Sequence, residues 1–196
     1  MITSTVIKKI FPEPCDKAYD KIKYDKEGLW SITHLKESDL ISDKILSFDE
    51  INLNSYVIDM TAGCGGNLLS FLKYFNNVTG IEIDETRYEM LVNNVNLYDI
   101  NEKDIKLFND SCINFLDKEY DVYFIDPPWG GPKYKSNDNL VLTLSDIPLI
   151  QILEKIGSFK LIVLKIPFNF DLGEIEAKFT IVDKIKLKNI IIVFLN

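Results

Sequence analysis

Residues 56–66 read YVIDMTAGCGG, an apolar run that ends in an acid and a glycine-rich turn. The run from Tyr56 to Met60 predicts a buried strand, and the glycines permit a tight turn where a ligand approaches the backbone closely. A helix is expected at residues 67–75 and a second strand at 78–83. This order of strand, turn, helix and strand indicates a mostly parallel sheet covered by helices.

The same alternation continues to the end of the chain. Helices are expected at 85–98, near 147–156 and, weakly, at 173–179, with strands at 105–108, 120–125 and 161–166 and a short helix or turn at 111–116. Segments 181–187 and 190–195 predict a closing hairpin whose last strand is antiparallel. The fold class is therefore α/β, a mostly parallel seven-stranded sheet with helices on both faces and a terminal antiparallel hairpin.

The first fifty residues differ from the rest because they are polar, lysine-rich and mixed in charge. An irregular start followed by a helix near 37–46 is expected. We therefore predict an N-terminal extension, residues 1–50, that contributes to the ligand pocket, and one α/β domain, residues 51–196.

Composition limits the classes of protein that fit. The 196 residues are 46% hydrophobic and 27% charged, with a net charge of −8. Cys15, Cys64 and Cys112 have no metal-binding spacing, and His34 is the one histidine, so no metal site and a reducing compartment are expected. No apolar stretch reaches the roughly 20 residues that span a bilayer. These features predict an intracellular protein, in nucleus or cytoplasm, that does not coat long nucleic acid.

Three acids follow three successive strands and predict the cofactor. Asp59 precedes the glycine turn around Gly63, Glu82 ends the second strand, and Asp110 ends the third. An acid in the position of Glu82 can bind both hydroxyls of a ribose, and Asp110 can accept a hydrogen bond from an adenine amine. Asp59 would repel a pyrophosphate but can pair with a cationic amino group. The set therefore fits S-adenosyl-L-methionine better than NAD.

Residues 126–129, Asp-Pro-Pro-Trp, follow the predicted strand 120–125. Two prolines stop the strand and fix a rigid turn, and Gly130 and Gly131 allow a sharp bend after it. The turn presents the Asp126 carboxylate, the carbonyls around the prolines and the flat ring of Trp129. We expect this clamp to hold a planar group that carries an exocyclic amine.

The combined pattern resembles the Rossmann-like class I S-adenosylmethionine-dependent methyltransferases, and more closely the trimethylguanosine synthases. Asp126 to Trp129 is similar to the (Asn/Asp/Ser)-Pro-Pro-(Tyr/Phe/Trp) motif of enzymes that methylate planar amines, and residues 127–134, PPWGGPKY, resemble the P-P-W-G-G-P-x-Y string of the synthases. Segments CGGN at 64–67 and DKEGLWSIT at 25–33, and the Asn93-Asn94 pair, agree with that family. The resemblance covers about residues 22–134.

The resemblance implies specific roles, position by position. The residues expected to contact the cofactor are Thr33, Asp59, Gly63, Glu82, Asp110 and Asp126. The expected catalytic residues are Asp126, Pro127, through its carbonyl, and Trp129. The expected substrate-binding residues are Ser31, Trp129, Lys133 and Tyr134, with Trp129 stacked on the cap guanine.

Two positions depart from the family pattern. Asp126 stands where the family often has serine, and Pro167-Phe168-Asn169 stands where it tends to have Pro-Arg-Asn. A phosphate-gripping arginine is therefore missing. The lysines that could replace it are Lys133, Lys135, Lys165, Lys8 and Lys9.

The resemblance implies transfer of a methyl group to the exocyclic N2 of a 7-methylguanosine cap, on capped RNA or a cap analogue, by a monomer. Two alternatives stay open. One is methylation of an internal RNA guanine or of DNA adenine, which the acidic charge and the lack of a separate basic domain disfavour. The other is a non-catalytic cap-binding subunit.

Overall fold

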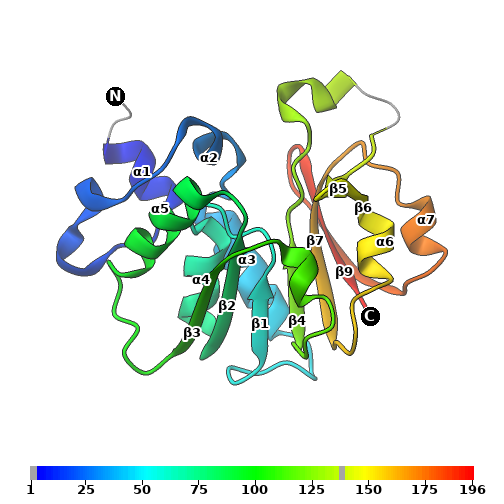
Figure 1. Cartoon of the computed structure of the whole chain (residues 1–196), viewed down its shortest axis with the longest axis horizontal. Coiled ribbons are helices and arrows are strands. Elements are labelled where there is room, and N and C mark those ends of the chain that lie inside the picture. Colours follow the sequence, from blue (N-terminus) through cyan, green and yellow to red (C-terminus); the bar gives the residue numbers. More distant parts are fainter. Residues whose placement is uncertain (1–3, 137–139) are drawn as a thin grey trace. The chain divides into compact units, whose positions relative to one another are not determined.

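The protein is described from a computed structural model that covers residues 4–136 and 140–196. It forms a mostly parallel seven-stranded sheet with helices, as predicted, together with a small separate two-stranded sheet (Figure 1). The chain divides into two compact units, one up to Asp110 and one from Ser111 on. The predicted division at residue 50 stays a prediction.

The first unit builds three parallel strands in the order β3-β2-β1. Its helices are α1 Ser4–Ile10, α2 Lys26–Ser31, α3 Leu35–Leu46, α4 Gly66–Tyr74 and α5 Glu85–Val95, with short 3₁₀ turns at Cys15–Lys17 and Tyr19–Lys21. The strands are β1 Tyr56–Asp59, β2 Asn77–Glu82 and β3 Asp104–Asn109. Helix α4 packs on β1 and β2, and α5 packs on β2 and β3. Each β–α–β connection therefore covers the sheet it joins, as parallel pairing requires.

The second unit carries strands in the order β4-β7-β9-β8. They are β4 Val122–Ile125, β7 Leu161–Pro167, β8 Ile181–Lys186 and β9 Ile190–Leu195. Its other elements are η3 Cys112–Phe115, η4 Gly131–Ser136, β5 Thr143–Leu144, β6 Ile147–Pro148, α6 Leu149–Leu153 and α7 Gly173–Glu176. Strand β4 is parallel to β7, whereas β9 is antiparallel to both β7 and β8, which confirms the predicted terminal hairpin.

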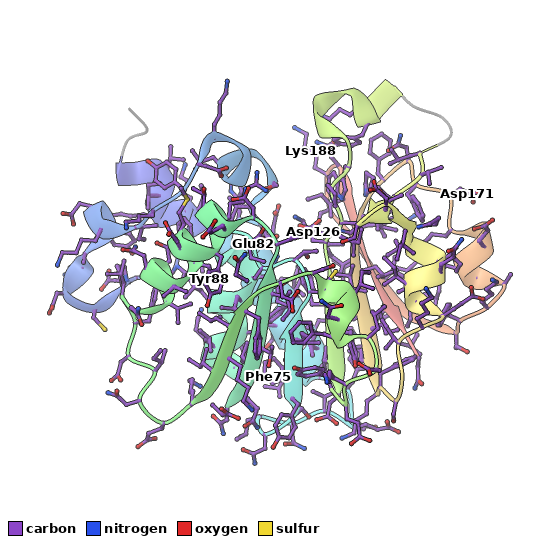
Figure 2. The ribbon with its side chains drawn as sticks, in the orientation of Figure 1. Phe75, Glu82, Tyr88, Asp126, Asp171 and Lys188 are labelled. Atoms are coloured by element: carbon purple, nitrogen blue, oxygen red, sulfur yellow. The ribbon has the colours of Figure 1, made fainter. Side chains whose placement is uncertain are left out.

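Strand β8 ends this order and alternates along its length. Ile181, Asp183 and Ile185 are half-buried, whereas Val182, Lys184 and Lys186 are exposed. Lys188 in the turn after β8 is also exposed and is labelled in Figure 2.

Two predictions of local structure are wrong. The start of the chain is helical at α1, where Ile7, Ile10 and the following Phe11 are buried. Short segments rich in β-branched residues have low helix propensity, so packing decides this helix. The helix predicted near 147–156 is shorter, because Ile147 and Pro148 pair with Thr143 and Leu144 before α6 begins. No helix within residues 4–136 and 140–196 combines the length and apolarity needed to cross a membrane.

Candidate active site

Hydrogen bonds within the turn and to β2 fix the backbone after β1. The Thr61 amide donates to Asp59 Oδ1 at 3.1 Å, and the Ala62 amide donates to the Ile81 carbonyl at 2.8 Å. Gly63 and Gly65 have positive φ values of 54° and 101°, a region in which side chains with a Cβ are strained. The turn then leads directly into the first turn of α4, whose backbone N–H groups favour a negatively charged ligand group.

The three predicted acids lie at the carboxyl ends of three neighbouring strands of the first unit. Asp59 is paired in register with Gly80 of β2, and Glu82 with Asn109 of β3. The Asp110 amide donates to the Glu82 carbonyl at 3.2 Å. Figure 2 shows Glu82 and Phe75 at opposite ends of the strands of this unit. Because the strands are parallel, the pairing places Asp59 and Asp110 at the same edge as Glu82.

Glu82 is already oriented by the backbone. Its Oε2 accepts from the Gly63 amide at 2.8 Å and its Oε1 accepts from the Asp84 amide at 2.9 Å. The carboxylate thereby ties the glycine turn to the end of β2. An acceptor pair fixed in this way suits two adjacent ribose hydroxyls.

Asn67, in the first turn of α4, connects the glycine turn to Thr33. Its Nδ2 donates to Thr33 Oγ1 at 2.9 Å, and both side chains are buried. Asn67 Oδ1 is buried without a hydrogen-bond partner among the described residues. A buried acceptor of this kind is costly unless a ligand donor meets it. The amino group of S-adenosylmethionine is such a donor, so the residues present fit the cofactor.

Asn94 joins the N-terminal segment to the glycine turn. It is fully buried in α5, where its Oδ1 accepts from the Lys23 amide at 2.8 Å. Its Nδ2 donates to the carbonyls of Lys23 at 2.8 Å and Cys64 at 2.9 Å. Neighbouring Asn93 donates to the Lys21 carbonyl at 3.0 Å. The segment that leads to Thr33 is therefore fixed beside the cofactor turn.

The hydrogen bonds of Asn94 to Lys23 and Cys64, here called the Asn94 clasp, give a testable stability prediction. Asn94→Ala leaves three backbone groups without their partner, two of Lys23 and the buried carbonyl of Cys64, which costs about 1–3 kcal/mol of unfolding free energy. At about 2–4 °C per kcal/mol for a chain of this size, Tm should fall by several degrees in a thermal melt. Asn93→Ala, at a more exposed neighbour with fewer bonds, is the matched control and should change Tm less. Equal melting of the two variants would show that Asn94 is not a clasp.

Cys64 lies in the same turn but is no nucleophile. Burial raises the pKa of its thiol to about 11, so the thiol stays protonated at neutral pH. The described residues hold no group of three or more His, Cys, Asp or Glu side chains able to bind a metal.

The second unit holds the predicted clamp. Strand β4 ends at Ile125, and Asp126 and the two prolines follow, with Gly130 and Gly131 at positive φ after Trp129. Asp126 Oδ2 pairs with Lys165 Nζ at 2.5 Å. The side chains are only 15% and 3% exposed. Burial raises the pKa of Asp126, and the neighbouring Lys165 ammonium opposes that rise.

Trp129 is held by aromatic and cationic contacts within this unit. Its ring meets Tyr134 edge to face, with centroids 5.1 Å apart and planes at 76°. Lys165 Nζ lies 5.4 Å from the indole centroid, within cation–π range. The indole Nε1 is buried and has no hydrogen-bond partner among the described residues. Asn169 Nδ2 donates to the Tyr134 backbone carbonyl at 2.9 Å, which ties the backbone of Tyr134 to the segment after β7.

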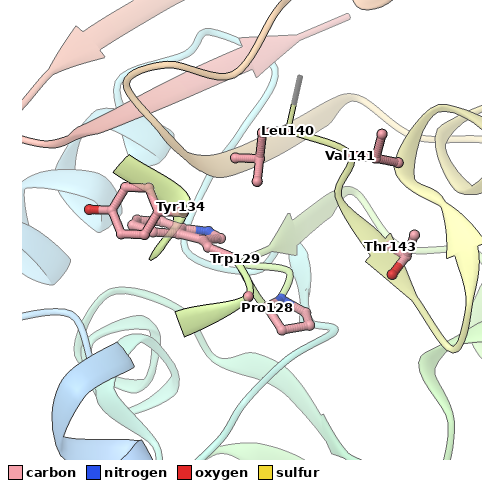
Figure 3. Close-up of a pocket in the computed structure, with 7 residues that line it drawn as sticks. Pro128, Trp129, Tyr134, Leu140, Val141 and Thr143 are labelled. Atoms are coloured by element: carbon pink, nitrogen blue, oxygen red, sulfur yellow. The ribbon is translucent and has the colours of Figure 1, made fainter. Parts of the chain in front are cut away.

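A cavity of about 440 Å³ opens beside these rings (Figure 3). It is lined by Pro128, Trp129, Gly130, Tyr134, Leu140, Val141 and Thr143. Its volume falls in the range of small-ligand sites, and aromatic and aliphatic side chains line it together with polar surface. A planar, hydrophobic-faced guest such as a purine base fits this character.

The predicted residues thus fall into two groups. In the first unit the cofactor candidates are connected, Thr33 through Asn67 and Gly63 through Glu82, while Asp59 and Asp110 lie at the ends of neighbouring strands. In the second unit Lys165 contacts both Asp126 and Trp129, and Trp129 contacts Tyr134; Pro127, the residue after Asp126, is buried. The roles of all these residues stay predictions.

Two further predicted substrate residues are Ser31, which belongs to the first unit, and Lys133. Ser31 is exposed, and its hydroxyl donates to the Gly28 carbonyl at 3.4 Å within α2. The side chain of Lys133 lies outside what the structure describes.

Lys165 has a role that the sequence interpretation missed. It was one of several lysines considered for gripping cap phosphates, but its burial and its pairing with Asp126 do not suit a solvent-exposed phosphate chain. The signal was present, because a single lysine inside the apolar strand 161–167 demands a buried anionic partner. The spacing of residues along the sequence does not show which acid forms the ion pair with Lys165.

Comparison with solved structures gives the class of protein. A putative methyltransferase of Porphyromonas gingivalis matches 93% of this chain, and 46% of its own, with a TM-score of 0.67 at 15% identity. A putative methyltransferase of Escherichia coli matches 80% of this chain, and 83% of its own, with a TM-score of 0.57 at 18% identity. The fold is therefore the Rossmann-like fold of methyltransferases, as predicted.

Comparison of sequences gives the family. A family model described as RNA cap guanine-N2 methyltransferase matches residues 54–195. An uncharacterised protein of Acanthamoeba polyphaga mimivirus is 33% identical over 190 residues, which span 83% of this chain and 73% of that protein. The trimethylguanosine synthase of Schizosaccharomyces pombe is 31% identical over 62% of this chain and 54% of its own length, so the chain spans about half of that relative. The chain belongs to the RNA cap guanine-N2 methyltransferase family.

The family membership identifies the chain as a methyltransferase and confirms the resemblance found in the motifs. Fold and family imply the use of S-adenosylmethionine. The glycine turn, the fixed carboxylate of Glu82 and the buried acceptor of Asn67 are consistent with that cofactor.

Proposed function

We propose that the protein transfers a methyl group from S-adenosylmethionine to the exocyclic N2 of a 7-methylguanosine cap. The observation that carries the proposal is the second-unit cavity lined by the Trp129 indole, together with the Lys165 ammonium that links this ring to the Asp126 carboxylate, an acceptor for an amine. Family membership supports the same substrate class.

Each unit has its own task in this proposal. Thr33, Asn67, Asp59, Gly63, Glu82 and Asp110 of the first unit bind the cofactor, which supplies an electrophilic methyl group when bound. Asp126, Trp129 and Tyr134 of the second unit bind the base. The resemblance of its motif also assigns Asp126 a contact with the cofactor, and this role is part of the proposal.

The chemistry rests on orientation of the amine. The N2 lone pair of guanine is delocalised into the ring, so the amine is a weak nucleophile. The Asp126 carboxylate and the Pro127 carbonyl accept its two hydrogens and direct the lone pair at the methyl carbon. Such positioning can lower a barrier by roughly 7–11 kcal/mol. The proton released with the new N–C bond passes to Asp126, directly or through water.

The positive charge of a 7-methylated base favours stacking on the Trp129 indole. A 7-methylguanine is cationic, and its stacking on an indole adds a cation–π contribution of about 0.5–2 kcal/mol. Because Asp126 neutralises the nearby Lys165, the site does not present a net positive charge to that base. The net charge of −8 also disfavours a long bare phosphate chain as the main contact.

Labelled S-adenosylmethionine tests the proposal with m7GTP and GTP as acceptors. We expect transfer to m7GTP at about tenfold higher kcat/KM than to GTP, from the cation–π contribution. Equal transfer to both, or transfer to neither, would contradict the cap proposal. Transfer only to long uncapped RNA or to DNA would favour an internal base instead. Cap binding without transfer would favour a non-catalytic subunit.

Capped RNA or a cap analogue is thus the proposed partner, and a monomer is the proposed state. A place inside the cell, in nucleus or cytoplasm, also stays a prediction.

A further inference from the structure

Lys165 occupies an unusual place for a charged residue. It lies in β7, all of whose residues are buried, and its neighbour across the sheet on β9 is the fully buried Ile192. An ammonium in such surroundings is strongly disfavoured unless an anion and hydrogen bonds compensate for lost water. The anion here is Asp126. The two residues therefore form a buried ion pair and not a surface one.

One ammonium touches both groups that the proposed function assigns to the base. Lys165 Nζ is 2.5 Å from Asp126 Oδ2 and 5.4 Å from the centroid of the Trp129 indole. Acid and plate are therefore held to a common point on a rigid strand. A side chain on a packed strand positions its partners better than one on a loop does.

We propose that Lys165 is the positioning residue of this site, which fixes the Asp126 carboxylate as a pure acceptor for the base amine and fixes the Trp129 ring beside it. This inference rests on the proposed function, and Lys165 itself touches neither substrate nor cofactor in it.

The ionisation state of Asp126 decides whether it can hold an amine. An ionised carboxylate only accepts hydrogen bonds, whereas a protonated one carries an O–H donor that would oppose the donor hydrogens of the amine. Burial raises the pKa of Asp126 and favours the protonated form, and Lys165 opposes this. Lys165 therefore favours the ionised form of the acid, which is the form that the chemistry requires.

The groups around the pair come from several elements of the second unit. Strand β9 presents Ile192 beside Lys165, η4 presents Tyr134 beside Trp129, and the loop after β4 presents Trp129 itself. Burial raises the pKa of the Tyr134 hydroxyl, so this residue is neutral at the pH of the reaction. Lys165 is the charged side chain that lowers the pKa of Asp126.

The same inference connects two features of the sequence. The related motif often has serine in the position of Asp126, and a neutral serine needs no counter-ion. Aspartate brings a charge into a buried strand end, and Lys165, two residues before Pro167, supplies the opposite charge.

The test compares Lys165→Met with wild type in the full-length protein. Methionine keeps the length and apolar stem of lysine but removes the charge. Methyl transfer to m7GTP is measured from pH 5 to 9, and the carboxyl carbon of Asp126 is titrated by ¹³C NMR without substrate. In the variant we expect the acid limb of the kcat profile and the NMR midpoint of Asp126 to move up by about one to three pH units. Loss of activity should then be much larger at pH 6 than at pH 9.

Two further variants separate positioning from general damage. Lys160, the residue just before β7, is a partly exposed lysine that pairs with Asp121. Lys160→Met should leave the midpoint of the acid limb and the NMR midpoint of Asp126 unchanged. The double variant Asp126→Asn with Lys165→Met removes both charges and keeps an amide acceptor. It should show no acid limb at any level of residual transfer, because no titrating carboxylate remains at this position.

The outcomes are distinct. An unchanged NMR midpoint in Lys165→Met, or an equal fold-loss of transfer at every pH, overturns the inference, because a merely structural lysine would give that result. If wild type methylates no base at all, the proposed function fails, whereas the NMR titration still reports whether Lys165 controls Asp126.

Discussion

Replacing Trp129 with alanine is expected to lower kcat/KM for methyl transfer to m7GTP by about a hundredfold. Stacking of a base on an aromatic side chain contributes about 1–3 kcal/mol, and a cationic base adds about 0.5–2 kcal/mol. At about 1.4 kcal/mol per factor of ten, the combined loss spans roughly 10- to 1,000-fold. Radiolabelled transfer at a series of m7GTP concentrations measures it.

Cofactor affinity is the internal control for this variant. All the residues proposed to bind S-adenosylmethionine other than Asp126 belong to the first unit, so titration calorimetry with S-adenosylhomocysteine should give an unchanged Kd. If cofactor binding falls as far as transfer does, Trp129 is a structural residue and the base-plate role is wrong.

Trp129→Phe is the matched variant. It keeps an aromatic plate but removes the indole N–H, which is buried without a hydrogen-bond partner among the described residues. A base stacked on the ring cannot accept from the N–H in the ring plane, so a neighbouring oxygen of the ligand would be its acceptor. Transfer intermediate between wild type and Trp129→Ala is expected. Activity equal to wild type would exclude a role for the N–H.

The second large effect is expected at Glu82. Glu82→Gln should raise the Kd for S-adenosylmethionine roughly 10- to 150-fold, since it removes a charged acceptor worth about 1.5–3 kcal/mol. The carboxylate uses one oxygen for the Gly63 amide and the other for the Asp84 amide. A glutamine amide replaces one of these acceptors with a donor that faces an N–H, so the glycine turn also loses a tether.

Titration calorimetry with S-adenosylhomocysteine checks this value. Glu85→Gln is the control, because Glu85 is an exposed acid in the first turn of α5 that no described contact ties to the glycine turn. It should bind the cofactor like wild type. Equal Kd values for Glu82→Gln and wild type would remove Glu82 from the cofactor site.

Much of the fold was predictable because its causes are local. Apolar runs of strand length alternate with helical patterns from Tyr56 onward, and parallel pairing places each strand end at the same edge. The positions of Asp59, Glu82 and Asp110 follow from that geometry, and glycines with positive φ mark the turn between them. The clamp at 126–129 was predictable for the same reason, since proline ends a strand wherever it stands.

The remainder depends on contacts between distant residues. Lys165 and Asp126 lie 39 residues apart, and Asn94 bonds to a backbone 71 residues away. No periodicity relates such positions, so the sequence shows a buried lysine and a buried asparagine without showing their partners. Helix α1 and the β5–β6 pair were missed because packing, not propensity, forms short elements.

The alternation along β8 bears on how the protein behaves at high concentration. β8 has one hydrogen-bonding neighbour, β9, and an edge strand offers unpaired N–H and C=O groups to any other strand. Lys186 is exposed on that strand and Lys188 follows in the turn, whereas Lys184 is paired with Glu176 at 2.8 Å. Two copies that met edge to edge would therefore bring the like charges of Lys186 and Lys188 together. This self-repulsion disfavours growth of the sheet across molecules and protects the chain against aggregation from the very strand that completes its fold.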